Sequence, residues 1–271
     1  MSASSSVALW WVRRDMRLAD NQALAAAMAH AEQVIPVFVL DPALMGADWA
    51  GEKRVAFLLG GLRALDADLR ARGSALIVRR GEPERELSAL LAESSASAIY
   101  AEADVWPYGA ERDARIAAEL PLHLCGGLTV HPTDAVLKAD GAPYAVYTPY
   151  SRRWKALPLP SARALLDAPD RVSTPPGIAS LPLPGEPVLP PEVPFVPGEA
   201  EALRHLEAFT RGDAGPPPID SYAEGRDRVD LDGTSRLSPY LRFGMLSTRR
   251  AVWRRSAGVG SSTEVRSRTT A

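Results

Sequence analysis

Residues 7–40 read VALWWVRRDMRLADNQALAAAMAHAEQVIPVFVL, and their pattern decides the fold class. Residues 7–12 are a short apolar run, which is typical of a strand buried in a parallel sheet. Residues 21–30 are rich in alanine and predict a helix, and residues 34–40 form a second strand-like run with Pro36 as an irregularity. Strand, helix and strand in this order favour an α/β architecture.

The same alternation continues to about residue 131. Further helices are predicted at residues 52–72, 82–93 and 108–120, and further strands at residues 75–78, 98–101 and 122–124. We therefore predict a doubly wound, Rossmann-like α/β domain over residues 5–132, built on a parallel five-stranded sheet. Such sheets bind ligands outside the carboxyl ends of their strands.

The pattern changes after this domain. Residues 133–198 predict an extended connector, because residues 158–198 hold half of the chain's 24 prolines, and proline interrupts helices and sheet ladders alike. We expect this connector to lie along the first domain. Residues 199–255 predict the start of an all-α domain, with Ser247 capping its last helix. Residues 256–271 lack large apolar side chains and predict a disordered tail.

Composition narrows the class of protein. The formal net charge of -2 gives no overall basic field for nucleic acid. The single cysteine, Cys125, excludes an intrachain disulfide framework and fits a reducing compartment. No apolar run reaches the roughly 18 residues of a membrane span, and residues 1–6 do not resemble a signal peptide. We expect a soluble cytoplasmic monomer without a metal site.

Residues 234–244, TSRLSPYLRFG, combine hydroxyl groups and a guanidinium before a predicted helix. Ser238 is a good N-cap residue and Pro239 fits the first helical position. Free N–H groups at a helix start favour a phosphate, so this segment is a candidate dock for a phosphorylated cofactor. Ordinary helix capping explains the hydroxyl groups equally well.

Residues 10–21 place three arginines and two aspartates just after the first strand. These residues fit an anion clamp at the binding edge of the sheet. They also fit an Arg–Asp network that ties a loop to the sheet, and the composition favours this second interpretation.

Several stretches, taken in order, resemble the DNA photolyase and cryptochrome family. They are residues 11–21, 36–42, 54–58, 222–226 and 234–244. The resemblance covers roughly residues 7–254 and points to class I cyclobutane pyrimidine dimer photolyases. It implies FAD in a C-terminal helical domain, contacted here by Tyr222, Thr234, Ser235, Arg236, Leu237 and Ser238. It also implies that Arg226 contacts a DNA phosphate, the alternative being a solvated surface arginine.

The resemblance also implies a second, light-harvesting chromophore in the first domain. Its site residues would be Arg54, Asp104 and Arg112. Residues 104–113 are closer to deazaflavin-binding members than to those that bind methenyltetrahydrofolate. Trp106 stands where an acidic residue is common, which would reshape or close the pocket. Without the resemblance, Arg112 would be interpreted as an ion-pair partner of Asp113.

The implied function is light-driven repair of cyclobutane pyrimidine dimers in UV-damaged DNA by electron transfer from reduced FAD. A cryptochrome-like photoreceptor and a free-standing α/β ligand-binding domain remain alternatives. In the family, motifs that enclose the flavin and the lesion follow the last matching residue, and this chain does not contain them. We therefore expect a truncated product with little or no retained FAD, impaired repair, and unpartnered apolar faces from residue 199 onward.

Overall fold

A parallel five-stranded sheet forms the centre of the protein. The computed structural model describes residues 6–45, 51–211 and 216–255. The strands are β1 (Val7–Trp11), β2 (Gln33–Leu40), β3 (Ile77–Arg80), β4 (Ala98–Ala103) and β5 (Leu122–Gly127). Their order in the sheet is β3-β2-β1-β4-β5, with every pairing parallel. This confirms the predicted doubly wound α/β fold and places the change of direction between β1 and β4.

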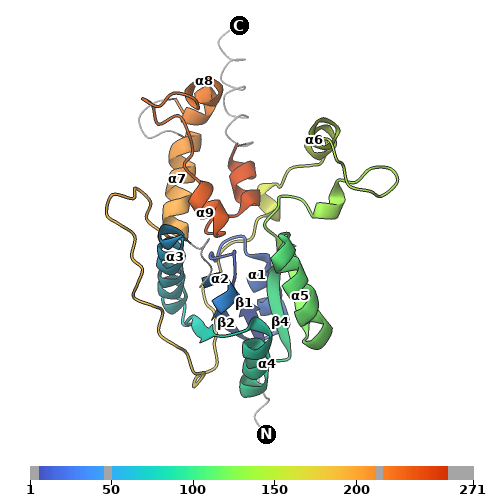
Figure 1. The fold of residues 1–271 in the computed structure, drawn as a ribbon, viewed down its shortest axis with the longest axis vertical. Coiled ribbons are helices and arrows are strands. Elements are labelled where there is room, and N and C mark those ends of the chain that lie inside the picture. The colour runs from blue at the N-terminus through green and yellow to red at the C-terminus, as the bar shows by residue number, and fades with distance from the viewer. Residues whose placement is uncertain (1–5, 46–50, 212–215, 256–271) are drawn as a thin grey trace.

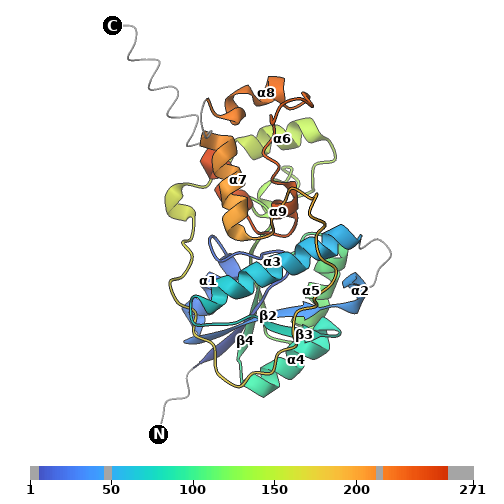
Figure 2. The same cartoon turned by 90° about the vertical axis from the view of Figure 1, so that its left-hand side faces the viewer.

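Helices cover both faces of the sheet (Figure 2). One face carries α1 (Gln22–His30) and α3 (Glu52–Arg70), and the other carries α4 (Pro83–Ser94) and α5 (Pro107–Glu119). Alternate residues of β1 therefore enter two separate cores. Trp10 packs with Leu24 and Leu62 on the first face, whereas Leu9 packs with Leu87 and Ile116 on the second.

The remaining helices are short or lie in the C-terminal part. They are α2 (Pro42–Met45), α6 (Tyr147–Lys155), α7 (Glu199–Arg211), α8 (Tyr222–Gly225) and α9 (Ser238–Arg242), followed by helical residues 248–255. Ser247 caps that last helix as predicted, since its hydroxyl accepts from the N–H of Arg250 at 3.3 Å. The predicted tail, 256–271, lies outside the described residues.

The Pro-rich connector lies along the α/β domain, as predicted. The N–H of Val172 donates to Arg72 at 3.0 Å, and the N–H of Leu181 donates to Val78 at 2.9 Å. Thr174 also bonds the hydroxyl of Ser74 at 2.6 Å. The connector's earlier part behaves differently, since α6 stands away from the body of the molecule (Figure 1).

The helical segment of residues 199–255 packs against the α/β domain, so our expectation of unpartnered apolar faces is wrong for its buried residues. Leu206, Tyr240 and Met245 are buried in the same core cluster as Leu62 of α3. The carboxylate of Glu199 accepts from the N–H of Leu18 at 2.7 Å. The sequence pattern predicted apolar faces from residue 199 onward, but not that α3 of the first domain contacts α7.

No helix in the described ranges is long and apolar enough to cross a bilayer.

Candidate functional site

A cavity of about 290 Å³ opens at the carboxyl ends of β1, β2 and β4. Its walls come from the loops after these strands, from the first turns of α3 and α5, and from the end of α9. Arg54, Asp104 and Arg112 all line it. The structure thus brings together the three residues predicted for a second chromophore, at the edge where doubly wound sheets bind ligands.

Stacked aromatic and guanidinium groups form one wall of the cavity. The guanidinium carbons of Arg13 and Arg112 lie 4.4 and 4.8 Å from the ring centroid of Trp11. Both arginines bond the same carboxylate oxygen of Asp113. The ion pair that we weighed as the alternative for Arg112 is therefore formed, and it holds this guanidinium on the wall of the cavity.

Tyr108 and Asp41 are site residues that sequence reasoning missed. The hydroxyl of Tyr108 donates to the carboxylate of Asp41 at 2.6 Å. Burial, and next the bond to Asp41, raises the pKa of Tyr108 to about 12, so the phenol stays protonated at neutral pH. A signal was available, because Asp41 directly follows the predicted strand 34–40 and strand ends point to this edge.

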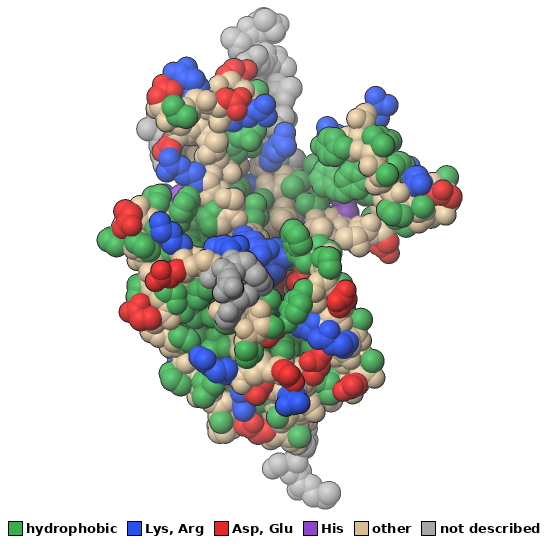
Figure 3. Space-filling view, in the orientation of Figure 1, with side chains coloured by type: hydrophobic (Ala, Val, Ile, Leu, Met, Phe, Trp, Pro, Cys, Tyr) green, Lys and Arg blue, Asp and Glu red, His purple; other side chains and the backbone are tan. Residues whose placement is uncertain are grey.

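Trp106 stands at the mouth of the cavity and does not close it. Its side chain is 57% exposed, and the guanidinium carbons of Arg14 and Arg242 each lie 5.9 Å from its ring. Burial, with Arg242 as the next cause, lowers the pKa of Arg14. Lys and Arg side chains gather at the waist of this face of the molecule (Figure 3). The mouth is therefore a cationic, aromatic rim.

Beneath the cavity, the loop after β1 is held by a buried polar network. Arg17 pairs with Glu102 at 2.5 Å, and Asp15 accepts from the indole of Trp10 and the amide of Asn21, each at 3.1 Å. Burial raises the pKa of Glu102 to about 7, against the lowering effect of Arg17. Within residues 10–21, Asp15 and Arg17 tie the loop to the sheet. Arg13 and Arg14 line the cavity instead.

The residues predicted to hold FAD lie apart from this cavity. Thr234, Arg236 and Ser238 are exposed, Ser235 is half-buried and Leu237 is buried. Arg236 has a φ of 50° and its guanidinium binds Asp232. None of the five lines this cavity or the second one at the end of β5.

The predicted N-cap role of Ser238 is wrong. Leu237 occupies the cap position in helical geometry, at φ -83° and ψ -7°, and no side chain caps the helix. Ser238 is already the first residue of α9. The left-handed backbone at Arg236 directs the chain into the helix, so the cap position falls on Leu237. The helix has five residues, so its start offers a weaker anion site than the sequence suggested.

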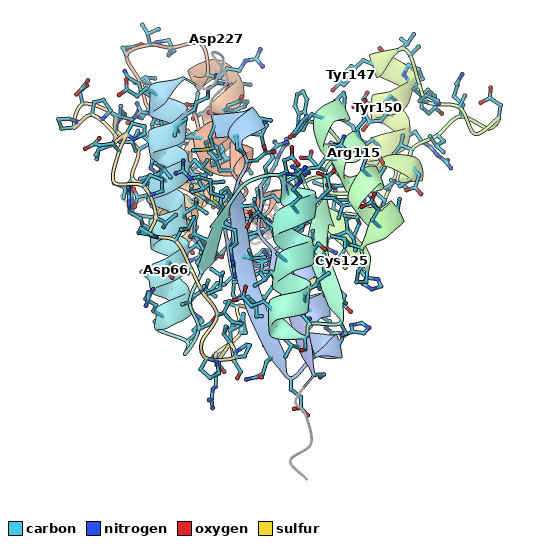
Figure 4. All side chains as sticks on the ribbon, turned by 60° about the horizontal axis from the view of Figure 1, so that its bottom comes forward. Asp66, Arg115, Cys125, Tyr147, Tyr150 and Asp227 are labelled. Carbon is cyan, nitrogen blue, oxygen red and sulfur yellow. The ribbon has the colours of Figure 1, made fainter. Side chains whose placement is uncertain are left out.

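Tyr222 and Arg226 share one exposed turn. Tyr222 is 43% exposed and meets the ring of Phe209 edge-on at 6.0 Å. Arg226 donates its N–H to Tyr222 at 3.0 Å, and its guanidinium lies 3.4 Å from Asp227. Asp227 lies far from Tyr147 and Tyr150 of α6 (Figure 4). Arg226 is thus an exposed arginine paired with the neighbouring Asp227 in this structure.

A second cavity, of about 400 Å³, lies at the carboxyl end of β5 and is bordered on one side by the connector. Arg249 lines it, pairs with Asp20 at 3.5 Å and bonds the carbonyl of Ala164. These bonds join the helix 248–255 to the loop after β1 and to the connector. The cavity therefore lies among groups that hold the segments together.

Comparison with known proteins identifies the family. The family model described as DNA photolyase matches residues 8–170. The deoxyribodipyrimidine photo-lyase of Streptomyces griseus is 37% identical over 96% of this chain and 58% of its own length. An uncharacterized 31.6 kDa protein of Synechococcus is 38% identical over 90% of this chain and 87% of its own length.

Solved structures agree with the sequence relatives. A bacterial class III photolyase from Agrobacterium tumefaciens superposes with a TM-score of 0.84 at 29% identity, covering 96% of this chain and 55% of that one. The chain spans about half the length of the curated photolyases that it matches. The match over residues 8–170 extends across the α/β domain and into the connector, and the chain therefore belongs to the DNA photolyase family.

Proposed function

We propose that the protein binds a planar, anionic light-harvesting chromophore in the cavity at the sheet edge and serves light-driven repair of pyrimidine dimers in UV-damaged DNA. The observation that carries this proposal is the joining of Trp11, Tyr108 and Arg112 in one cavity at the carboxyl ends of the strands. Relatives named deoxyribodipyrimidine photo-lyase support the repair reaction. We expect the protein to act as a cytoplasmic monomer.

The residues present fit such a chromophore. Five arginines line the cavity (Arg13, Arg14, Arg54, Arg112 and Arg242), against the carboxylates of Asp41 and Asp104 in its wall and of Asp113, which Arg13 and Arg112 share. This surplus of positive charge favours an anion, and the indole and phenol faces favour a flat ring. A compact cavity suits a tricyclic deazaflavin better than a folate, whose pteridine carries a long aminobenzoyl-glutamate arm.

Each group in the cavity has a distinct task in this proposal. A bound chromophore would supply absorption of light and transfer of its excitation energy. Tyr108 and Trp106, whose rings are exposed, would border the plane of the ring, whereas the buried Trp11 would back the Arg13 and Arg112 guanidinium groups that bind its charged edge and any anionic side chain. Because the Tyr108 phenol stays protonated, it would donate to Asp41 throughout the neutral range and hold the α5 side of the cavity in place.

For FAD, the fit is partial. Thr234, Ser235 and Ser238 offer hydroxyl groups, while Arg236 is engaged by Asp232 and would have to exchange partners to bind a phosphate. Together with Tyr222 and Leu237 they would hold one side of FAD, whose reduced ring supplies the electron for repair. We expect this chain to retain little FAD by itself, and Arg226 to contribute one phosphate contact to DNA.

Titration of the purified protein with 8-hydroxy-5-deazariboflavin tests the chromophore proposal, read out by ligand fluorescence. We expect one bound ligand per chain, and at least tenfold weaker binding by Tyr108→Ala. Tyr147→Ala is the matched control, because Tyr147 is 75% exposed on α6 and does not line the cavity. Tighter binding of methenyltetrahydrofolate than of the deazaflavin would contradict the choice of chromophore.

A dimer-repair assay with added reduced FAD and blue light tests the reaction. We expect repair by this chain to fall well below that of the Streptomyces griseus relative. Full repair with stoichiometric FAD would contradict the partial fit described above.

A further inference from the structure

The wall of the cavity has two origins. Most of its residues belong to the α/β domain, whereas Arg242 and Phe243 come from the end of α9 in the helical segment. Phe243 stacks on Phe57 of α3, with their ring centroids 5.8 Å apart. The cavity is therefore complete only while this part of the helical segment lies against the α/β domain.

Three consecutive carbonyl groups fix that arrangement. The carbonyl of Arg242 accepts from Nε of Arg14 at 3.2 Å. The next carbonyl, of Phe243, accepts from the N–H of Met16 at 3.3 Å, and that of Gly244 accepts from Nη1 of Arg17 at 3.1 Å. The turn of residues 242–244 thus rests on the same loop that supplies Arg13 and Arg14 to the cavity.

The turn tolerates only glycine at its third position. Gly244 has a φ of +63°, and a Cβ atom built there would lie 1.7 Å from the carbonyl oxygen of Arg14. Both the left-handed backbone and the contact with rigid main chain oppose any side chain. A single added Cβ atom at residue 244 should therefore disturb docking of the turn, although Gly244 does not line the cavity.

Docking also brings positive charges together. Arg14 and Arg242 lie on the same ring of Trp106, and Asp104, at 3.6 Å from Arg14, is the nearby carboxylate. Repulsion between two guanidinium groups weakens docking, and an anion held between them offsets that repulsion.

We propose that ligand binding in the cavity and docking of residues 237–247 on the loop after β1 are one coupled equilibrium. This inference rests on the chromophore-binding function proposed above and adds a consequence to it. An anionic planar ligand stabilises the docked turn. By reciprocity, undocking of the turn lowers the affinity of the cavity for the ligand. Because Thr234 to Ser238 directly precede and enter α9, occupancy of the cavity also orders the segment assigned to FAD.

Hydrogen exchange of the whole chain tests the coupling, with FMN as the probe and riboflavin as the same ring without the phosphate. We expect saturating FMN to slow exchange of the amides of residues 241–247 at least fivefold. Riboflavin should bind about tenfold more weakly, since it lacks the phosphate charge. Equal affinities would contradict the role of the guanidinium pair.

Two glycine variants sharpen the test. Gly244→Ala should weaken FMN binding at least tenfold although Gly244 does not line the cavity. Gly177→Ala is the control, because Gly177 has a φ of +82° but no atom lies within 4 Å of the position that its Cβ would take, and it should bind FMN as the parent does. If Gly244→Ala fails to fold, the exchange measurement on the parent chain decides.

The outcomes separate the two proposals. FMN binding with unchanged exchange at residues 241–247, or with unchanged affinity in Gly244→Ala, contradicts the coupling and leaves chromophore binding intact. A chain that binds neither FMN nor riboflavin contradicts the coupling, and the deazaflavin titration described above decides the chromophore proposal separately.

Discussion

The two candidate cofactor regions of this protein differ in how they are supported. The cavity at the sheet edge is backed by buried polar groups, with Arg112 and Asp113 only 5% and 2% exposed. The segment of residues 222–238 is mostly exposed, and its Arg236 is held by Asp232 on the same short loop. A site with locked side chains binds at lower entropic cost than one that must be ordered by its ligand.

The two regions therefore differ in how far their side chains are ordered before any ligand binds. Groups under the cavity are fixed by folding, because the loop after β1 bonds β4, α7 and the turn after α9. Groups around residues 222–238 contact mainly their own neighbours. Variants in the two regions should therefore differ in their effect, and the largest effect is expected under the cavity.

Replacing Arg17 by methionine should lower the free energy of unfolding by about 3–5 kcal/mol, because it removes a buried guanidinium that pairs with Glu102 and bonds the carbonyls of Asp20 and Gly244. Urea unfolding measures the change. Arg70→Met is the control, since Arg70 is 65% exposed and pairs with Asp66, and it should cost less than about 0.5 kcal/mol. Similar losses for the two variants would show that the network does not support the fold.

Two tyrosines of the helical segment should respond very differently. Tyr240 is fully buried and its hydroxyl bonds the carbonyl of Val196 at 3.1 Å, so Tyr240→Ala should cost about 3–5 kcal/mol. Tyr222→Ala, at an exposed position, should cost less than about 1 kcal/mol. Thermal unfolding compares them, and equal effects would mean that the segment is not docked as described.

The contribution of Glu102 to stability should fall as the pH rises from about 4.5 to about 7. Burial raises the pKa of Glu102 to about 7 in the folded chain, from an ordinary 4.5. The folded state therefore binds more protons than the unfolded state in this window, and the neutral carboxyl is the stabilised form. The contribution amounts to up to about 3 kcal/mol, from about 1.4 kcal/mol per pKa unit.

Glu102→Gln should flatten this dependence, as measured by urea unfolding at several pH values. Glu82→Gln is the control, because the Glu82 side chain is 64% exposed. An unchanged slope in Glu102→Gln would assign the pH dependence to other groups.

The smallest effect on ligand affinity is expected for Trp106, at the mouth of the sheet-edge cavity. Trp106→Ala should weaken FMN binding about three- to fivefold, the loss of an exposed cation–π and stacking contact of about 0.5–1 kcal/mol. Fluorescence titration of the variant against Tyr147→Ala gives the ratio. A hundredfold loss would show that Trp106 encloses the ligand rather than borders it.

The alternation of apolar runs was sufficient to predict the sheet and its helices, because burial of both faces leaves a direct pattern in the sequence. Strand β3 was placed two residues early, at 75 instead of Ile77. Leu76 is apolar, but its N–H is taken by the side chain of Asp66 at 2.9 Å, so pairing with β2 starts one residue later.

The candidate site was predicted only in part. Arg54, Asp104 and Arg112 were identified through the family resemblance, and the cavity brings them together. Asp41, Tyr108 and Arg242 were missed, since each acts through a partner distant in sequence. The docking of residues 199–255 was missed for the same reason: an amphipathic helix shows that it has a partner, but not which one.

Titration with FMN of three chains tests the central claim, that the sheet-edge cavity is the ligand site this chain builds by itself. The chains are the parent, Tyr108→Ala, and the double variant Thr234→Ala with Ser235→Ala. We predict one site, weakened at least tenfold by Tyr108→Ala and unchanged in the double variant. Loss of binding in the double variant, with Tyr108→Ala unaffected, would contradict the account.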